Sequence, residues 1–286
     1  MSTFGEALRQ GTLAIRDSGV STSEALDAML LLCKATGLTK EQIYSRPDTE
    51  LTAQPRSLFG TLLQRRCAAE PIAYILGERE FFGRRFHVDA RVLIPRPDTE
   101  ILVEQALDLL EAHTEAKVLD LCTGSGCIGI TIAAERPQAT VTLADISNEA
   151  LAVAADNVNV LLSNTLELVQ GNLFGSLPNR RFHMIITNPP YLAGQWYQTT
   201  AAQVKREPYS ALVGGGEEGL DLIRTIVAEA PEHLESEGAL LIECDDRQNT
   251  TVACLMEKAG FTSVSSSHDL AGCRRIVWGR LPCTKN

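Results

Sequence analysis

The sequence predicts an α/β protein: a mostly parallel seven-stranded sheet with helices on both faces, preceded by an N-terminal helical bundle. In residues 1–75, apolar side chains recur at three- and four-residue spacing, which is the helical period. From residue 117 onward, strand patterns alternate with helical ones, as expected of a parallel sheet. A glycine-rich turn at 122–126 joins the first of these strands to the first helix. We expect a helical domain over 1–75, a hairpin and linker over 76–97, and an α/β domain over 98–286.

The size and charge of the chain limit its function classes. A chain of 286 residues can bury a large core, and its net charge of −10 disfavours a protein that lives on duplex DNA. The start, 1–6, lacks the basic and apolar regions of a signal peptide, and no apolar run approaches ~18 residues, so we expect a cytoplasmic protein without a membrane span. The 8 cysteines form no Cys-x-x-Cys pair, which favours reduced thiols and no metal site.

The first predicted helix begins near Phe4, and Gly11 falls on its apolar stripe, where a larger side chain is expected. Ser21 and Glu24 have the spacing of a capping box, which predicts that a second helix starts there. The stripe expected to be buried in this second helix is Leu26, Met29, Leu30 and Cys33.

Two more helices are predicted before the bundle ends. Thr39 and Gln42 repeat the capping-box spacing, and Thr52 precedes a longer helix that closes at 70–71, Glu-Pro. Nothing in residues 1–75 resembles catalytic chemistry. The bundle is therefore either purely structural or a domain that binds a macromolecular substrate, and we assign it the substrate-recognition role.

The segment 76–97 has a different sequence pattern from the helical region before it. The aromatic pairs around Gly83 predict a tight hairpin, and the prolines of the run 94–100 predict an extended path. Asp98 is expected to cap the helix that follows this run. A linker would explain the segment, but its polar side chains would alternatively line a pocket beside the next domain; these are Arg96, Thr99 and Glu100.

The α/β region contains the predicted strands of the sheet. Apolar and β-branched runs predict strands at 117–121, 140–144, 166–169, 181–186, 239–243, 262–266 and 275–278. A helix is predicted over 148–161, and Gly171–Phe174 follows the third strand.

The glycine-rich turn is typical of a nucleoside cofactor site. Small residues let the backbone approach a ligand, and Asp145, at the end of the next strand, could accept both ribose hydroxyls. Residues 124–129 match G-x-G-x-x-G, but that string alone leaves both NAD and S-adenosylmethionine open. A nicotinamide site usually places an acid/base side chain at a later strand end, and the sequence has none there, which favours methyl transfer.

That later strand end carries Asn188, Pro189, Pro190 and Tyr191. Two prolines stop the strand, so Asn188 lies at its carboxyl end, where open α/β sheets bind ligands. The Asn side-chain oxygen and the proline carbonyls are acceptors, and Tyr191 adds an aromatic face. This arrangement suits a planar NH₂ group; the simpler interpretation is a turn that ends a strand.

In these motifs the chain resembles the HemK/PrmC family, whose members methylate the glutamine of the Gly-Gly-Gln motif in peptide chain release factors. The resemblance covers nearly the whole chain and rests on 188–191, on the turn 120–126, on 71–77 with Phe81, on 94–100, and on Asp269-Leu270-Ala271-Gly272 with Arg275. It departs from the family at Cys122, where glycine is usual, at Asp98, where glutamate is usual, and in 243–246, which leaves the role of Glu243 open.

The resemblance implies a Rossmann-like methyltransferase fold and S-adenosylmethionine as the cofactor. The expected catalytic residues are Asn188, Pro189, Pro190 and Tyr191, which would also bind the substrate together with Arg96, Thr99 and Glu100. The expected cofactor-binding residues are Asp120, Cys122, Thr123, Gly124, Ser125, Gly126, Asp145, Asn172, Leu173 and Asn188. Three alternatives stay open: a DNA adenine amino-methyltransferase, an NAD-dependent oxidoreductase, and a binding protein that retains only the cofactor fold.

Overall fold

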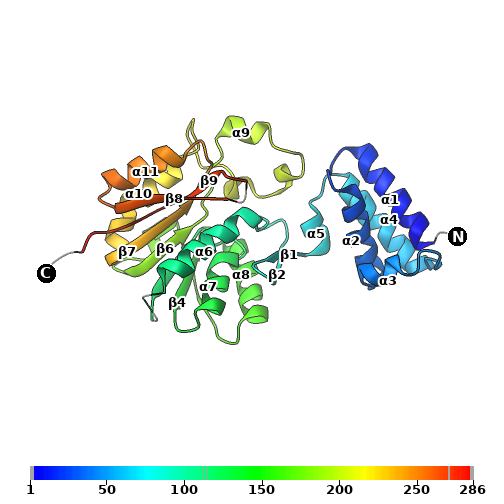
Figure 1. The fold of residues 1–286 in the computed structure, drawn as a ribbon, viewed down its shortest axis with the longest axis horizontal. Helices are drawn as coiled ribbons and strands as arrows, with labels where there is room; N and C mark the ends of the chain where they lie inside the picture. The colour runs from blue at the N-terminus through cyan, green and yellow to red at the C-terminus, as the bar shows by residue number, and fades with distance from the viewer. Residues whose placement is uncertain (1–2, 112, 114, 270, 284–286) are drawn as a thin grey trace. The chain divides into compact units, whose positions relative to one another are not determined.

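The computed structural model describes residues 3–111, 113, 115–269 and 271–283. The chain divides into two compact units (Figure 1). The first is Met1–Glu78 with Thr200–Arg206, and the second is Arg79–Thr199 with Glu207–Asn286.

The first unit is a helical bundle. Its helices are α1 (Phe4–Ser18), α2 (Glu24–Thr36), α3 (Lys40–Tyr44), α4 (Ala53–Cys67) and α5 (Ile72–Leu76). Gly11 is buried in α1, and a Cβ atom on it would lie 2.8 Å from Cζ of Phe59 in α4. The glycine on the apolar stripe of α1 therefore makes room for a phenylalanine ring.

Helix α2 corrects two predictions. Its N-cap is Ser23, while Ser21 accepts a hydrogen bond from the Ser23 backbone N–H at 3.1 Å, so the predicted capping box at Ser21 is wrong. The predicted stripe is also partly wrong, because Leu26 is 48% exposed. Since α2 packs against both α1 and α4, its buried face is wider than one stripe and includes Ala28, Met29, Leu31 and Leu32. The capping box of Thr39 and Gln42 at the start of α3 is confirmed.

A buried ion pair holds the first unit together. Arg66 of α4 is 2% exposed, and its Nε donates to Oδ2 of Asp27 in α2 at 2.7 Å. The same guanidinium donates to the backbone oxygen of Val20 and to Oε1 of Gln203. Gln203 lies in the stretch 200–206, far along the sequence. Its hydrogen bond with Arg66 is a polar contact that joins this stretch to the helices of the first unit. Removing either partner of a buried ion pair is strongly destabilising.

The predicted hairpin, β1 (Glu78–Phe81) and β2 (Arg84–His87), belongs to the second unit from Arg79 onward. Its turn residues Phe82 and Gly83 both have positive φ, 49° and 71°, as a tight hairpin turn requires. The 3₁₀ helix η1 (Pro97–Thr99) and α6 (Glu100–Leu109) follow. Asp98 lies inside η1, and the N-cap of α6 is Thr99 without a side-chain cap, so the predicted cap at Asp98 is wrong.

A seven-stranded sheet forms the centre of this unit, in the order β5-β4-β3-β6-β7-β9-β8. The strands are β3 (Lys117–Leu121), β4 (Thr140–Asp145), β5 (Glu167–Gln170), β6 (Phe182–Thr187), β7 (Leu234–Glu243), β8 (Thr262–His268) and β9 (Arg274–Arg280). Among the described strands of this seven-stranded sheet, only β9 runs antiparallel to its neighbours, β7 and β8. The predicted mostly parallel seven-stranded α/β fold with an N-terminal helical region is confirmed.

Helices cover both faces of the sheet (Figure 1). One apolar core joins the sheet to α6, α7 (Cys127–Glu135) and α8 (Asn148–Leu161), and the other joins it to α10 (Asp221–Glu229) and α11 (Asn249–Lys258). The remaining short helices are η2 (Leu173–Ser176), α9 (Gly194–Gln198), η3 (Val204–Arg206), η4 (Tyr209–Ala211) and η5 (Ala230–His233). No helix among the residues described here is long and apolar enough to span a membrane.

The strand order reverses at β3. Strand β3 pairs with β4 on one side and with β6 on the other, and Leu121 is opposite both Ala144 and Thr187. The carboxyl ends of these three strands therefore meet at one edge. A crevice at such a reversal point is where open α/β sheets bind ligands.

Gly129 of α7 allows this helix to pack closely on the sheet. A Cβ atom there would lie 2.3 Å from Cδ2 of Leu143 and 3.0 Å from Cβ of Asp120. Gly129→Ala should lower stability by about 1–2 kcal/mol, because overpacking exceeds the helix-propensity gain of alanine. Thermal unfolding would measure this, with Gly175→Ala as the control, because a Cβ on Gly175 meets nothing within 4 Å. Equal melting temperatures for the two variants would contradict the close packing.

Candidate functional site

A cavity of about 680 Å³ lies at the carboxyl ends of β3, β4 and β6. Eleven of the predicted site residues line it: Arg96, Thr99, Cys122, Thr123, Gly124, Ser125, Asp145, Asn172, Leu173, Asn188 and Pro190. Five predicted residues are not in its wall: Glu100, Asp120, Gly126, Pro189 and Tyr191. The cavity thus contains the predicted cofactor turn and the predicted acceptor group together.

Buried hydrogen bonds shape the glycine-rich turn. Asp120, which is fully buried, accepts from the Thr123 hydroxyl at 2.5 Å and from the Gly129 N–H at 2.9 Å through its Oδ2 atom. Burial raises the pKa of Asp120 to about 7. Asp120 therefore supports the turn from behind the cavity wall.

Cys122 has a left-handed backbone conformation, with φ of 61°. For a residue with a side chain this conformation costs about 1–2 kcal/mol, which explains why glycine suits the position. Burial, with a smaller contribution from the Asp145 charge, raises the pKa of the Cys122 thiol to about 12. The departure from the usual glycine is therefore tolerated at a modest conformational cost and places a protonated thiol in the cavity wall.

Asp145 lies opposite the turn. Its Oδ2 accepts from the Gly124 N–H and its Oδ1 from the Ser147 N–H, each at 2.9 Å. A carboxylate oxygen can accept more than one hydrogen bond, so both oxygens keep acceptor capacity beside the cavity. Burial raises the pKa of Asp145, and the backbone N–H bonds oppose that rise. A vicinal diol, such as the ribose of a nucleoside, fits this acceptor pair, and a Cβ on Gly124 would project into open space that a ligand can fill.

Asn188 lies at the end of β6. Its Nδ2 donates to Oγ1 of Thr99 at 3.2 Å, and no described residue donates to its Oδ1. The side-chain oxygen is therefore the free acceptor of this amide, at the wall of the cavity. Pro189 is buried, and the Pro190 backbone oxygen lies against Gly214, where a Cβ would approach it to 2.4 Å.

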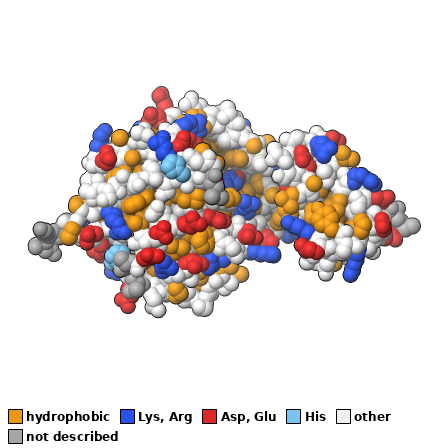
Figure 2. Space-filling view, viewed as in Figure 1, with side chains coloured by type: hydrophobic (Ala, Val, Ile, Leu, Met, Phe, Trp, Pro, Cys, Tyr) orange, Lys and Arg blue, Asp and Glu red, His pale blue; other side chains and the backbone are white. Residues whose placement is uncertain are grey.

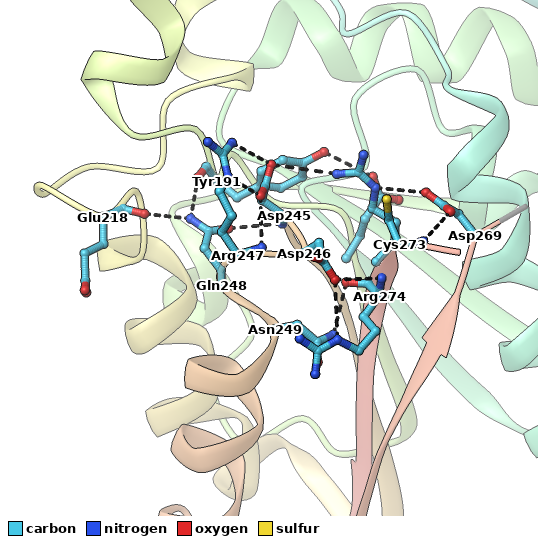
Figure 3. A network of polar contacts seen from close by, with 12 residues as sticks. Tyr191, Glu218, Asp245, Asp246, Arg247, Gln248, Asn249, Asp269, Cys273 and Arg274 are labelled. Atoms are coloured by element: carbon cyan, nitrogen blue, oxygen red, sulfur yellow. Dashed lines mark hydrogen bonds and ion pairs between the residues drawn. The ribbon is translucent and has the colours of Figure 1, made fainter. Parts of the chain in front are cut away.

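Tyr191 lies behind the wall. Its hydroxyl donates to Oε1 of Glu243 at 3.4 Å, and its backbone oxygen accepts from Nε2 of Gln248 at 2.7 Å. Gln248 also donates to the Glu218 backbone oxygen at 2.6 Å, so one amide ties the chain after Tyr191 to a distant loop (Figure 3). Both the backbone and the hydroxyl of Tyr191 are thus held by buried partners.

The predicted polar trio separates in the structure. Arg96 is in the cavity wall and donates to Oε1 of Glu207, while Thr99 is 2% exposed and bonded to Asn188. Glu100 instead accepts from the backbone N–H of Phe82 at 2.9 Å and supports the hairpin. Glu207, which is 4% exposed, holds the Arg96 segment a second time by accepting from the Ile94 N–H at 3.0 Å.

Sequence reasoning missed the wall that residues 207–225 provide, including Tyr209, Gly214, Asp221 and Leu222. One sequence signal could have located it, the run of three glycines at 214–216. A Cβ on Gly214 would lie 2.1 Å from the Gly219 backbone oxygen, so the run marks close backbone packing beside the site. Glu207 has no comparable signal.

The motif at 269–275 is a turn built on one carboxylate. Oδ1 of Asp269 accepts from the Ala271 and Cys273 N–H groups at 2.9 and 2.8 Å, and Oδ2 accepts from Nε of Arg275 at 3.2 Å. Leu270, also part of the motif, lies outside the described residues. Within the described chain no group of His, Cys, Asp and Glu side chains could hold a metal ion.

Comparisons with known proteins agree with this geometry. Residues 6–77 match the family model described as the PrmC N-terminal domain, and 98–218 match the methyltransferase small domain. A release factor glutamine methyltransferase of Burkholderia pseudomallei is 42% identical over 268 residues, covering 92% of this chain and 94% of the relative. A release factor glutamine methyltransferase of Pseudomonas aeruginosa is 43% identical over 263 residues, covering 92% of this chain and 95% of the relative. A crystal structure of a methyltransferase from Pyrococcus furiosus shares the fold, with a TM-score of 0.52 at 16% identity over 78% of this chain and 99% of that one.

Proposed function

Because the chain belongs to the family of release factor glutamine methyltransferases, we propose that it transfers a methyl group from S-adenosylmethionine to the side-chain amide nitrogen of the glutamine in the Gly-Gly-Gln motif of peptide chain release factors. The observation that carries the proposal is the identity of 42% over 92% of this chain. The free acceptor of Asn188 in a cavity at the sheet reversal point supports it. Release factors act in the cytoplasm, so the proposal places the enzyme there.

The residues present fit the cofactor. Asp145 would accept its ribose hydroxyls, and the turn 122–126 would approach it through backbone. Asn172 and Leu173, also in the cavity wall, would complete this side of the pocket. When bound, S-adenosylmethionine supplies an electrophilic methyl group.

The rest of the mechanism concerns the substrate amide. Its nitrogen is a poor nucleophile, because the lone pair is delocalised into the carbonyl; peptide C–N rotation, at ~18–20 kcal/mol, shows the size of that resonance. As methyl transfer begins, the nitrogen loses planarity and gains positive charge. Oδ1 of Asn188 and the Pro189 backbone carbonyl would accept its N–H bonds and stabilise that charge without reorganising. No strong base is needed, because the product cation loses its proton to water.

Tyr191 is proposed to hold the plane of the substrate amide by stacking. Its hydroxyl and backbone oxygen are both held by buried partners, which fixes the position of its ring. Arg96 and Thr99, which are in the wall, would border the entering loop.

The comparisons do not favour the DNA adenine methyltransferase alternative. The curated relatives reported above carry a release factor name, and the net charge is −10. On the face shown in Figure 2, basic and acidic side chains are intermixed. Duplex binding requires basic surface for phosphates, and the target base would have to be flipped out of the stack.

The test is to incubate the protein with methyl-labelled S-adenosylmethionine and a purified release factor, and to locate the label by peptide mass spectrometry. We expect label on the glutamine of the Gly-Gly-Gln motif and none on a release factor in which that glutamine is alanine. Duplex and single-stranded DNA serve as parallel acceptors. Label on adenine, with none on the glutamine, would establish the rival function instead.

The helical unit is proposed to bind the body of the release factor. A chain that begins at Leu76 should keep the α/β core and still gain thermal stability from S-adenosylhomocysteine, since a ligand that binds only the native state stabilises it. Its kcat/KM should fall for a whole release factor and stay near that of the intact chain for a short Gly-Gly-Gln peptide. Equal kcat/KM of the two chains on the whole factor would remove the recognition role.

A further inference from the structure

Glu243 is a buried carboxylate that the proposed mechanism does not use. It ends β7, next to β6 in the sheet, and is 2% exposed. Its Oε1 accepts from the Tyr191 hydroxyl, whereas no described residue satisfies its Oε2 in hydrogen-bond geometry. An unsatisfied buried acceptor costs about 1–3 kcal/mol, and more when it is charged. A group retained at such a cost calls for a functional explanation.

Thr99 is a polar neighbour of both Asn188 and Glu243. Its hydroxyl accepts from Nδ2 of Asn188, so its own hydrogen remains available to donate. The same hydroxyl lies near enough to Glu243 to lower the pKa of the carboxyl, although no hydrogen bond joins the two side chains in the described residues. The free hydrogen of Thr99 and the unsatisfied oxygen of Glu243 are therefore a donor and an acceptor that match.

An ionised carboxylate can only accept hydrogen bonds, and this sets the direction of the whole chain of contacts. With Glu243 ionised, a Thr99 hydroxyl that turns toward it can only donate, and Thr99 then accepts from Asn188. The Asn188 amide then presents Nδ2 to Thr99 and Oδ1 to the cavity. With the opposite amide orientation, the cavity would face an NH₂ group, which repels the N–H bonds of a substrate amide.

We propose that Glu243 is a positioning residue that, through Thr99, holds the Asn188 side-chain oxygen toward the substrate amide; this rests on the methyltransferase function proposed above. Glu243 does not line the cavity, so it acts through this neighbour and not on the substrate itself.

The charge on Glu243 depends on groups from several elements. Burial is the largest influence and raises the pKa to about 7. Arg275 of β9 lowers the pKa, Asp98 of η1 raises it, and the Tyr191 hydroxyl lowers it. Because the orienting form is the ionised one, kcat should rise as pH increases through about 7 and level off above it.

Glu243→Gln tests the proposal. The glutamine NH₂ can donate to Thr99, which would then donate to Asn188 and favour the wrong amide orientation. We expect kcat on a purified release factor to fall about 10-fold at pH ~8, the size of one lost net hydrogen bond. The part of the kcat rise around neutral pH that follows the ionisation of Glu243 should disappear, while the stabilisation by S-adenosylhomocysteine stays as in the unmodified chain. Asp246→Asn is the control, because that side chain is 46% exposed in the same segment and pairs with Arg274.

Asp120 has a pKa raised to a similar value, so the variants must separate the two carboxyls. In Glu243→Gln, only the part of the kcat rise that depends on Glu243 should vanish. Thr99→Val should also abolish the rise in kcat, Thr99→Ser should keep it, and the effects of Thr99→Val and Glu243→Gln should not add, because both break the same chain of contacts.

The outcomes are distinct. If the unmodified chain does not label the glutamine, the proposed function fails. If it does, and Glu243→Gln keeps both the kcat and the pH profile of the unmodified chain, the positioning role is overturned. If Glu243→Gln does not fold, it will lose its protection by S-adenosylhomocysteine, and the two Thr99 variants then decide the question. Identical pH profiles of kcat for Thr99→Val and Thr99→Ser overturn the proposal. Loss of the rise in kcat with pH in Thr99→Val alone supports it.

Discussion

Asn188→Ala should lower kcat for the release factor ~10²–10³-fold, by analogy with the loss of one preorganised oxyanion-hole donor. The substitution removes the free Oδ1 acceptor in the cavity wall and leaves β6 and the two prolines in place. The rate should fall in single-turnover measurements, because the lost interaction forms in the transition state. Stabilisation by S-adenosylhomocysteine should change much less.

Asn148→Ala provides the matched control, since Asn148 is an exposed residue at the start of α8. It should retain the rate of the unmodified chain. If Asn188→Ala kept more than about one tenth of that rate, an acceptor other than Asn188 would have to stabilise the developing charge.

Asp145→Ala should weaken the binding of S-adenosylhomocysteine by about 1.5–3 kcal/mol, or roughly 10–150-fold in Kd, because a charged acceptor of two hydroxyls is lost. Asp145 also holds the Gly124 and Ser147 N–H groups, so part of this loss comes from a loosened turn. Asp145→Asn separates the two contributions, since it removes the charge but keeps one acceptor oxygen. Isothermal titration calorimetry would measure all three chains.

The expected order of affinity is the unmodified chain, then Asp145→Asn, then Asp145→Ala. NAD should give no heat of binding and no thermal protection. Protection by NAD, with none by S-adenosylhomocysteine, would refute the assignment of the cofactor.

Much of the fold follows from local sequence patterns. The strand 117–121 and the helix 148–161 have the predicted bounds, because a short apolar segment before a glycine-rich turn and a 3.6-residue period are both strong signals. The end of β6 was also predictable, since two successive prolines cannot continue a strand. These elements were predictable because their signals lie within a few residues of one another along the chain.

The failures concern choices among neighbours and contacts between distant residues. Ser21 and Ser23 offer nearly equal local chemistry for a helix start, and the wrong one was chosen. The pairing of Arg96 with Glu207 spans 111 residues, and no local pattern encodes it. The environment of Glu243 is likewise created by β9 and η1, whose positions depend on the whole sheet. The cavity turn and its acceptor could be predicted, whereas the buried groups behind them could not.

The thiol of Cys122 bears on the chemical selectivity of the site. A thiolate is a far stronger nucleophile than an amide, and an activated methyl donor held beside one would alkylate the protein itself. Burial raises the pKa of the Cys122 thiol to about 12, so the thiol is protonated at neutral pH. Cys127, also in the wall, has a pKa raised to about 12 by the same burial. Both cysteines in the cavity wall thus present the protonated thiol, the less nucleophilic form, to a bound methyl donor.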